Sequence, residues 1–295
     1  MGAPTQPTKL RRKRGAHGGT PRQIQMDQQQ ALPNRPVVLT IAGLDPSGGA
    51  GIVADIKTIS AFGCFPAAAL TSVTYQNTTG VFGAEHQSAE TLRSQVVPII
   101  TDLNVVAAKT GMLPTAEIVA EVARLFGGSN LPAPVVDPVM VSTSGHDLID
   151  SEALKIVKTR LLQVARVVTP NIPEAERLAG FSIVNEFEMR NAAETIKSMG
   201  ARAVLIKGGH RLNTVSNDAV DILLNEDGNF TEFHGEFVDI GEVHGSGCTL
   251  SAAIASSLAL GSSVEEAVRE AKRYITEKIR ALKHTPRIGH GARPI

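Results

Sequence analysis

The stretch ARVVTPNIPEAERLAG, residues 165–180, contains one instance of the pattern that decides the fold. Its apolar start predicts a short buried strand, and Thr169-Pro170-Asn171 form the loop that follows. Residues 173–180 predict a helix, because proline is favoured in the first turn of a helix and glycine just after the last turn. A strand, a polar loop and a helix in this order are the repeating unit of an α/β protein.

The same alternation continues on both sides of this stretch. Residues 218–238 break it, because two strand-like runs flank Asn225-Glu226-Asp227-Gly228 and predict a β-hairpin. We therefore expect a mostly parallel central sheet. The predicted strands are 37–42, 65–76, 105–111, 133–140 and 201–209, and the predicted helices are 54–62, 88–103, 115–126, 151–162, 186–200, 247–260 and 263–283.

Polar or glycine-rich groups follow almost every predicted strand. Ligands of a mostly parallel sheet bind beyond the carboxyl ends of its strands, so these groups are expected to meet at one edge. Any one of them could be a plain connection, but six together would be unusual in a protein that binds nothing. The groups are 43–51, 76–77, 109–112, 137–140, 169–171 and 207–210.

The sequence VHGSGCTLSAAIASSLALG, residues 243–261, predicts a buried helix that begins at Gly-Ser-Gly. The first N–H groups of a helix lack partners within the helix and carry partial positive charge, so this start can bind an anion such as phosphate. The same field would lower the pKa of Cys248 and favour its thiolate. The alternative is a glycine-rich helix start with a cysteine that packs as a small apolar residue.

Composition narrows the class of protein. The chain has 295 residues, of which 42% are apolar and 20% charged, and its formal net charge is +0. A neutral balance argues against nucleic acid as the main partner, and no apolar run is long enough for a transmembrane helix. Its two cysteines, Cys64 and Cys248, form no CxxC motif. We therefore expect a reducing, cytoplasmic location without disulfides or structural zinc.

Residues 1–34 differ in composition from the rest of the chain. Six basic residues precede the first acid, Asp27, and apolar residues are sparse. We expect a disordered basic tail, followed by one domain over residues 35–295. The basic run precedes no apolar core, which excludes a secretory signal. A transit peptide and a true start at Met26 remain alternatives.

Seven segments in register carry a resemblance to a known family. They are GLDPSGGAGIVADIKT, TYQNTTG, KTGML, DPVM, TPNIPEAERL, IKGGH and HGSGCTLSAAIA. Over about residues 37–291 the chain resembles hydroxymethylpyrimidine/phosphomethylpyrimidine kinases of thiamine biosynthesis, members of the ribokinase-like superfamily. The resemblance implies a three-layer sandwich with helices on both faces of the sheet. It also implies ATP-dependent phosphorylation of 4-amino-5-hydroxymethyl-2-methylpyrimidine and then of its monophosphate, with Mg²⁺ as cofactor and a homodimer as one possible assembly.

The resemblance also implies roles for individual residues. Gln76 would bind the pyrimidine, and its amide, which can both donate and accept, suits a ring nitrogen beside an amino group. A primary hydroxyl is a poor acid, so we expect Cys248 to assist proton removal late in the transfer. The implied residues are Gly43, Asp55, Gln76 and Met112 for the pyrimidine; Cys248 as base, with Gly245, Ser246 and Gly247 as the anion hole; Asp137, Thr169, Asn171, Lys207 and Gly209 for the nucleotide; and Glu174 for Mg²⁺ through water.

Several of these residues also have plainer interpretations. Asp55 and Glu174 could each favour the start of their own helix, since carboxylates stabilise that end. Lys207 could contact phosphate or only end a strand. Val243 stands where many relatives carry threonine, so the role of that position cannot be carried over.

Three nearby sites have expectations of their own. Asp45 is expected to hold the following turn as an Asx-type residue. Cys64 is expected to pack at a helix-to-strand turn. His210 and His244 are expected to shape loops.

Other functions are alternatives to the kinase. A pyridoxal kinase of the same superfamily is the nearest of them. A Cys-His hydrolase would use Cys248 and His244, but no third group to orient the histidine is evident. A non-catalytic nucleotide-binding protein would bind ATP without releasing ADP. The loop at 43–51 lacks both GxGxxG and a Walker lysine, which disfavours a dehydrogenase.

Overall fold

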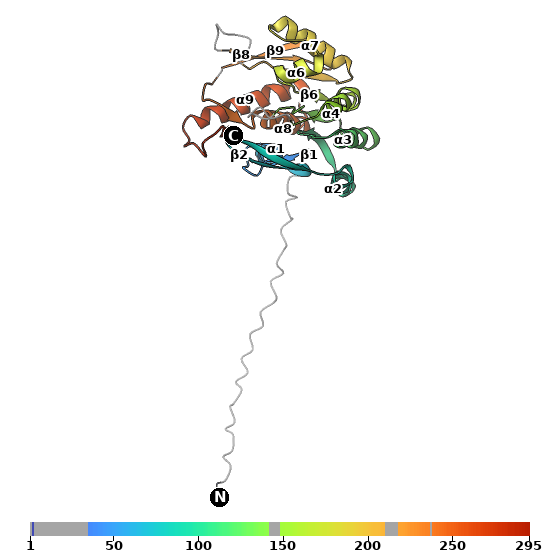
Figure 1. Ribbon diagram of the computed structural model, residues 1–295, viewed down its shortest axis with the longest axis vertical. Coiled ribbons are helices and arrows are strands. Elements are labelled where there is room, and N and C mark those ends of the chain that lie inside the picture. The colour runs from blue at the N-terminus through green and yellow to red at the C-terminus, as the bar shows by residue number, and fades with distance from the viewer. Residues whose placement is uncertain (1, 3–34, 142–147, 210–217, 237) are drawn as a thin grey trace, which may run out of the picture. The chain divides into compact units, whose positions relative to one another are not determined.

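The computed structural model describes residues 2, 35–141, 148–209, 218–236 and 238–295. The predicted tail therefore lies outside the described residues except for Gly2, and Arg35–Ile295 form one compact unit. A nine-stranded sheet of order β3-β2-β1-β4-β5-β6-β7-β8-β9 runs through this unit (Figure 1). Its strands are β1 (Val37–Leu44), β2 (Phe65–Asn77), β3 (Gly80–His86), β4 (Val105–Thr110), β5 (Val135–Val136), β6 (Val167–Val168), β7 (Ala203–Lys207), β8 (Asp218–Leu224) and β9 (Phe230–Glu236).

The sheet is mostly parallel, as predicted. The strands from β2 to β7 in this order pair in parallel, whereas β3 pairs antiparallel with β2, and β8 and β9 form an antiparallel hairpin beside β7. The hairpin confirms the prediction for 218–238. The carboxyl ends of the parallel strands therefore meet at one edge, where ligands of such sheets bind.

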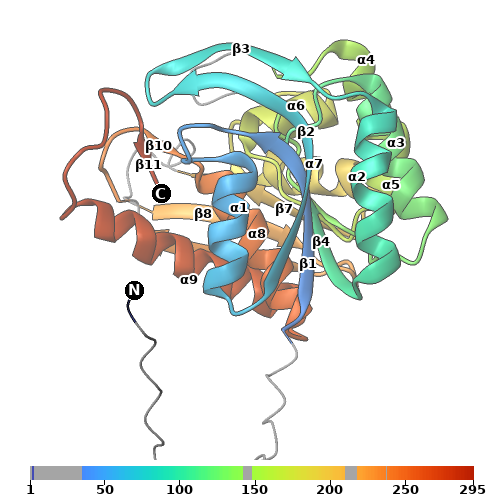
Figure 2. The same ribbon diagram turned by 90° about the horizontal axis from the view of Figure 1, so that it is seen from below.

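Helices cover both faces of the sheet, so the fold is a three-layer α/β sandwich. Alternate residues of β7 show why: Val204 and Ile206 enter one apolar core, and Ala203 and Leu205 enter the other. Figure 2 shows the two groups of helices on opposite sides of β1 and β4. One face carries α1 (Gly51–Ala61), α8 (Ser246–Ala259) and α9 (Val264–Leu282); the other carries α2 (Ala89–Asp102), α3 (Ala116–Gly128), α4 (Ser151–Ile156), α5 (Leu162–Val164), α6 (Ile172–Ala179) and α7 (Glu186–Ser198).

The structure adds elements that the sequence does not predict. Strand β3 is an exposed edge strand, and it lacks the buried apolar run by which a strand is recognised. A π-helical turn, Val157–Leu161, joins α4 to α5 within the single helix predicted at 151–162. Strands β10 (Val243–His244) and β11 (Arg293–Pro294) form a separate two-stranded parallel sheet.

Candidate active site

A cavity of about 910 Å³ lies at the carboxyl ends of the parallel strands and at the start of α8. The structure brings most of the predicted site residues to its wall. Asp55 and Thr169 are not among the lining residues, and His210 lies outside the described residues. The predicted residues that line the cavity are Gly43, Gln76, Met112, Asp137, Asn171, Glu174, Lys207, Gly209, Gly245, Ser246, Gly247 and Cys248.

Two helices begin at this cavity without a side-chain cap. The N-caps of α1 and α8 are Ala50 and Gly245, and neither side chain accepts a hydrogen bond from its helix. The first N–H groups of α8 therefore keep their positive partial charge at the cavity. At the start of α1, in contrast, the Gly51 N–H bonds to Cys248, and the Asp45 carboxylate accepts from the N–H groups of Gly49 and Ala50. Six other helices are capped by their own side chains: Ser88, Thr115, Asp150, Asn171, Asn185 and Ser263.

Glycine is required where the starts of α1 and α8 meet. Gly245 has φ +85°, and a Cβ at this position would lie 1.9 Å from the carbonyl oxygen of Gly49. Only a residue without a side chain permits both this backbone conformation and this approach. The glycines therefore hold the loop of residues 43–51 against the predicted anion hole.

Cys248 lies in the first turn of α8, but its thiol is not activated as predicted. Burial raises the pKa of the Cys248 thiol to about 11, and the nearby carboxylates of Asp55 and Asp137 add to this effect. The positive charge of Lys109 and a hydrogen bond from the Gly51 backbone N–H oppose it without reversing it. The predicted lowering of the Cys248 pKa is therefore wrong, because removal from water outweighs the field of the helix.

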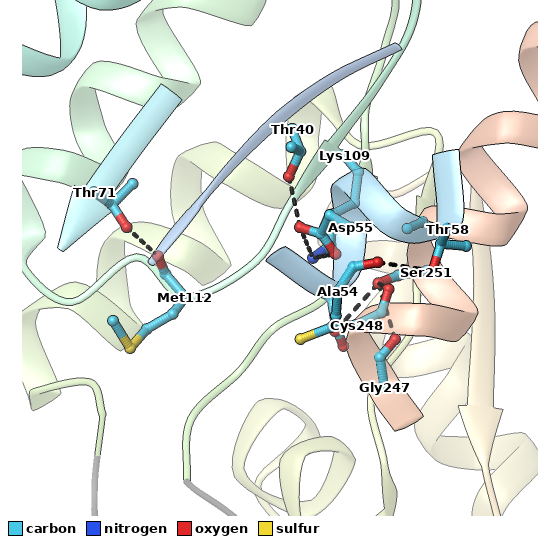
Figure 3. Close-up of polar contacts among 12 residues, drawn as sticks. Thr40, Ala54, Asp55, Thr58, Thr71, Lys109, Met112, Gly247, Cys248 and Ser251 are labelled. Atoms are coloured by element: carbon cyan, nitrogen blue, oxygen red, sulfur yellow. Dashed lines mark hydrogen bonds and ion pairs between the residues drawn. The ribbon is translucent and has the colours of Figure 1, made fainter. Parts of the chain in front are cut away.

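Asp55 is occupied by an ion pair behind the cavity. Lys109 Nζ lies 2.9 Å from both carboxylate oxygens of Asp55, and Thr40 Oγ1 donates to Asp55 at 2.6 Å. Both charged side chains are 0% exposed. Figure 3 shows the contacts of the Asp55 carboxylate with Lys109 and Thr40. Although burial opposes its charge, Asp55 keeps the pKa of Lys109 above its usual value. Asp55 is therefore satisfied inside the protein, beside Cys248, rather than at the cavity surface.

A second Asp–Lys pair lies on the cavity wall. Lys207 Nζ lies 3.2 Å from Asp137 Oδ1, and Ser251 of α8 donates to Asp137 Oδ2 at 3.2 Å. A Cβ at Gly247 would lie 3.3 Å from Lys207 Nζ, so the ammonium lies against the start of α8. Thr169, 0% exposed, lies behind this pair with Oγ1 3.4 Å from Asp137. The Lys207 ammonium and the uncapped N–H groups of α8 thus lie next to each other on the cavity wall.

Asn171 and Glu174 form the capping box that starts α6. Asn171 N–H donates to Glu174 Oε2 at 2.8 Å, and Glu174 N–H donates to Asn171 Oδ1 at 2.9 Å. Burial raises the pKa of Glu174 to about 7; Lys207 opposes this rise and Asp137 adds to it. Both carboxylates line the cavity and repel each other, so a cation between them would relieve the repulsion.

Gln76 is held from two sides at the opposite end of the cavity. Thr74 Oγ1 donates to Gln76 Oε1 at 2.9 Å, and His244 Nε2 lies 3.3 Å from Gln76 Nε2. The remaining donor and acceptor capacity of this amide is available to a ligand. His244 Nε2 also lies 2.9 Å from Asp45 Oδ2. His244 therefore links the loop after β1 to the strand that carries Gln76.

The expectation for Asp45 is confirmed. Its Oδ1 accepts from the backbone N–H and the hydroxyl of Ser47, which is an Asx-type turn. Although burial opposes it, hydrogen bonds from His244 and Ser47 lower the pKa of Asp45 below its usual value. Cys64 is buried between α1 and β2, as expected of a packing residue.

Sequence reasoning missed the part of the wall that comes from the end of the chain. Lys272, Ile275 and Ile279 of α9 line the cavity, as do Gly291 and Ala292. The amphipathic pattern of α9 predicts a buried face but not that part of this face borders a ligand site. The glycines at 289 and 291 were the available signal for a close backbone approach.

Comparison with known proteins agrees with this geometry. A family model described as phosphomethylpyrimidine kinase matches residues 45–295. The chain belongs to the phosphomethylpyrimidine kinase family. It is thus a phosphotransferase of the ribokinase-like fold, as the sequence motifs predicted.

Curated relatives cover most of the chain. The hydroxymethylpyrimidine/phosphomethylpyrimidine kinase of Streptomyces coelicolor is 47% identical over 247 residues, which are 83% of this chain and 89% of that protein. The enzyme of the same name from Haemophilus influenzae is 40% identical over 257 residues, which are 87% of this chain and 94% of that protein.

Solved structures share the fold. The phosphomethylpyrimidine kinase from Clostridium difficile 630 is 41% identical, with a TM-score of 0.73 and coverage of 83% of this chain and 100% of that chain. The pyridoxal kinase from Staphylococcus aureus in complex with AMP-PCP and pyridoxal is 31% identical, with a TM-score of 0.77 and coverage of 88% of this chain and 93% of that chain.

A helix with the length and apolar character of a membrane span does not occur among the described residues.

Proposed function

We propose that this family member transfers the terminal phosphoryl group of ATP to the hydroxymethyl group of 4-amino-5-hydroxymethyl-2-methylpyrimidine, and then to the resulting monophosphate. One observation carries the proposal: the uncapped start of α8 places Cys248 in one cavity with Gln76 at one end and Lys207 with Asp137 at the other. A donor and an acceptor can therefore meet at the glycine amides.

The acceptor end suits a small flat ring. Gln76 offers a donor and an acceptor side by side, which match a ring nitrogen and its neighbouring amino group. Met112 and Gly43 form the apolar part of the wall, and a Cβ at Gly43 would lie 2.5 Å from Met112 Cε. We assign Asp55 to positioning behind this wall, since Lys109 and Thr40 already satisfy its carboxylate.

The phosphoryl group would lie at the start of α8. Phosphoryl transfer needs alignment and charge neutralisation more than covalent chemistry from the protein. The N–H groups at Gly245, Ser246 and Gly247 would hold the transferring oxygens, and Lys207 would neutralise their charge. Removal of one such donor typically lowers turnover by about 100- to 1000-fold.

Cys248 would take the hydroxyl proton as the new bond forms. With its pKa raised to about 11, the thiol is protonated at neutral pH in the protein without ligands. The thiol must therefore first release its own proton to solvent, and Lys109 and the start of α8 would stabilise the thiolate that results. This thiolate would accept the hydroxyl proton late in the transfer, as the new O–P bond forms, and would return to the thiol.

Asp137 and Glu174 fit a hydrated Mg²⁺. Two buried carboxylates that repel each other on the cavity wall are the donors that a hard cation prefers. The described residues contain no group of three or more His, Cys, Asp or Glu that could hold a metal alone, so waters and phosphate oxygens would complete the shell. When bound, Mg²⁺ would neutralise phosphate charge.

The nucleotide would occupy the end of the cavity formed by α9 and the β8–β9 hairpin. Ile275 and Ile279 of α9 offer an apolar wall there, and Asn171 and Gly209 line the phosphate side. The S. aureus structures with AMP-PCP and with ADP support nucleotide binding in this fold. Thr169, behind Asp137, is assigned to positioning that carboxylate.

Side-by-side turnover tests the proposal. ADP release would be measured with the aminopyrimidine alcohol, its monophosphate and pyridoxal, each with Mg·ATP. We expect the highest kcat/KM with the aminopyrimidine alcohol. Gln76→Leu should lower that value at least tenfold, while Gln163→Leu, at an exposed position of α5 away from the cavity, serves as the matched control. Preference for pyridoxal, which the likeness to pyridoxal kinases favours as the second candidate, would overturn the assignment.

Two further properties belong to the same proposal. The exposed edge strand β3 carries Phe82, 71% exposed, next to Tyr75 of β2, 53% exposed, and we propose this edge as the contact of a homodimer.

Both cysteines are free, which suits a reducing compartment such as the cytoplasm. The mass in solution tests the first point, and labelling of both thiols in freshly isolated protein tests the second.

A further inference from the structure

The segment of residues 289–295, here called the C-terminal strap, closes the acceptor end of the cavity. Gly291 and Ala292 of the strap line the cavity next to Thr78 and Val243. None of the roles assigned above uses the strap. Its contacts nevertheless join every part of the chain that surrounds Gln76.

The strap is bonded to the turn between β2 and β3. Ala292 N–H donates to the carbonyl oxygen of Thr78 at 2.9 Å, and Gly291 N–H donates to Thr78 Oγ1 at 3.3 Å. A Cβ at Gly291 would lie 1.7 Å from the Thr78 carbonyl oxygen, so glycine is required for the contact. Because Gln76 precedes this turn by two residues, the strap fixes the end of the strand that carries it.

The strap is also bonded to the residues just before the anion hole. Arg293 N–H donates to Glu242 O at 2.9 Å, and Ile295 N–H donates to His244 O at 3.3 Å, in the parallel pairing of β10 with β11. Arg293 Nη1 donates to Leu282 O at 2.5 Å, which ties the strap to the end of α9. The strap therefore holds His244 by its backbone.

The ring of His244 lies between the strap and the loop after β1. A Cβ at Gly49 would lie 2.7 Å from His244 Cδ2 and 2.8 Å from Pro294 Cβ, so these three residues pack tightly. In this position His244 Nε2 lies 2.9 Å from Asp45 and 3.3 Å from the Gln76 amide. A shift of the strap would move His244 and, through it, Gln76.

We propose that the C-terminal strap is a positioning element for acceptor specificity: it holds the His244 ring, which packs against the Gln76 amide, and the Thr78 turn, and so fixes the position from which Gln76 reads the ring. This inference rests on the proposed function for the identity of the ring. A polar site discriminates strongly only when its donors and acceptors are fixed, because a mobile amide can turn to suit either partner. The nucleotide end uses Ile275 and Ile279 of α9, whereas the strap is bonded to α9 at Leu282, beyond these residues.

Two variants loosen the strap, and two matched controls leave it intact. Gly291→Ala forces the strap away from Thr78, and Ile295→Pro removes the N–H group that donates to His244 O. Gly128→Ala adds a Cβ where nothing lies within 4 Å, and Ile295→Ala keeps the N–H group. Steady-state kinetics would be measured with the aminopyrimidine alcohol, with its analogue carrying an oxo group in place of the amino group, and with ATP.

We expect both strap variants to raise KM for the aminopyrimidine about tenfold and to lower its preference over the oxo analogue at least tenfold. KM for ATP should change less than twofold, and both controls should behave as the wild type. Unchanged preference in Ile295→Pro would overturn the proposal even if Gly291→Ala failed to fold. If the wild type phosphorylates another aromatic alcohol instead, the proposed function fails, and the same variants then test the strap with that alcohol.

Discussion

Two of the Asp–Lys pairs among the described residues, Asp55–Lys109 and Asp137–Lys207, lie near the carboxyl ends of the parallel strands, and they differ in access to the cavity. Asp55 and Lys109 are both 0% exposed, whereas Lys207 is 18% exposed and Asp137 2% exposed. The first pair makes two bonds of 2.9 Å and is closed, while the second makes one contact of 3.2 Å and faces the start of α8. We therefore expect the same residue types to serve structure in one place and ligand binding in the other, because burial decides which charge is available.

Breaking the closed pair should have the largest effect on stability. Lys109→Met leaves the Asp55 carboxylate buried without its cation, and loss of one partner of a buried pair lowers the free energy of unfolding by about 3–5 kcal/mol. Urea denaturation measures this change. The double variant Asp55→Leu/Lys109→Met should recover most of the loss, since an apolar pair leaves no unpaired charge. A loss below about 1 kcal/mol in the single variant would show that the pair is not isolated from water.

Breaking the open pair should act on turnover instead. Lys207→Met removes the cation beside the anion hole, and we expect kcat/KM to fall by about 100- to 1000-fold with little change in the urea midpoint. Lys155→Met, at an exposed position of α4, is the matched control. If Lys207→Met unfolded as easily as Lys109→Met, the two pairs would not differ in the way described.

Cys248 lies close to both pairs, and its substitution tests whether this residue acts as the general base. Cys248→Ser should bind the acceptor normally and lose about 10- to 100-fold in kcat, as expected for a general base. Because the thiol pKa is about 11, kcat of the wild type should rise with pH between 7 and 9. Cys248→Asp, which carries a base already ionised at neutral pH, should lose that rise. A wild-type rate in Cys248→Ser would exclude Cys248 as the base.

Glu174 should give the smallest effect, a change in the pH dependence of stability. Burial raises its pKa to about 7 in the folded protein, against 4.5 for the free side chain, so the folded state binds the extra proton. Unfolding releases this proton between pH 4.5 and 7, and stability therefore decreases as pH rises through that window. Glu174→Gln should flatten this dependence, by at most about 3 kcal/mol. Urea midpoints at pH 5 and pH 8 without magnesium measure it, and equal slopes in both proteins would contradict the assignment.

Much of the architecture could be predicted from periodicity. The alternation of apolar runs and amphipathic helices predicted the parallel sheet, and Asn225-Glu226-Asp227-Gly228 predicted the β8–β9 hairpin. Strand β3 could not be found this way, because an exposed edge strand carries no buried run. Strands β10 and β11 are too short for any periodicity to appear.

The site could be predicted in position but not in electrostatics. Gly-Ser-Gly before Cys248 predicted an anion site, and the structure places these residues at the cavity, where anion binding stays a prediction. The helix field suggested an acidic thiol, but burial raises the pKa of Cys248 instead. Nor does the sequence show that Lys109 takes up the charge of Asp55, since 54 residues separate them. Desolvation and long-range pairing depend on the packed structure, which local patterns do not contain.

The uncapped start of α8 has a consequence for handling the protein. This helix begins at a concavity, and its N-cap Gly245 has no side chain to satisfy the first N–H groups, so we expect a tetrahedral oxyanion to bind there and to stabilise the fold. By mass action such an anion favours the native state in proportion to its saturation. Sulfate or phosphate in the buffer should therefore raise the melting temperature while competing with the nucleotide, so a storage solution that preserves the enzyme would also inhibit it.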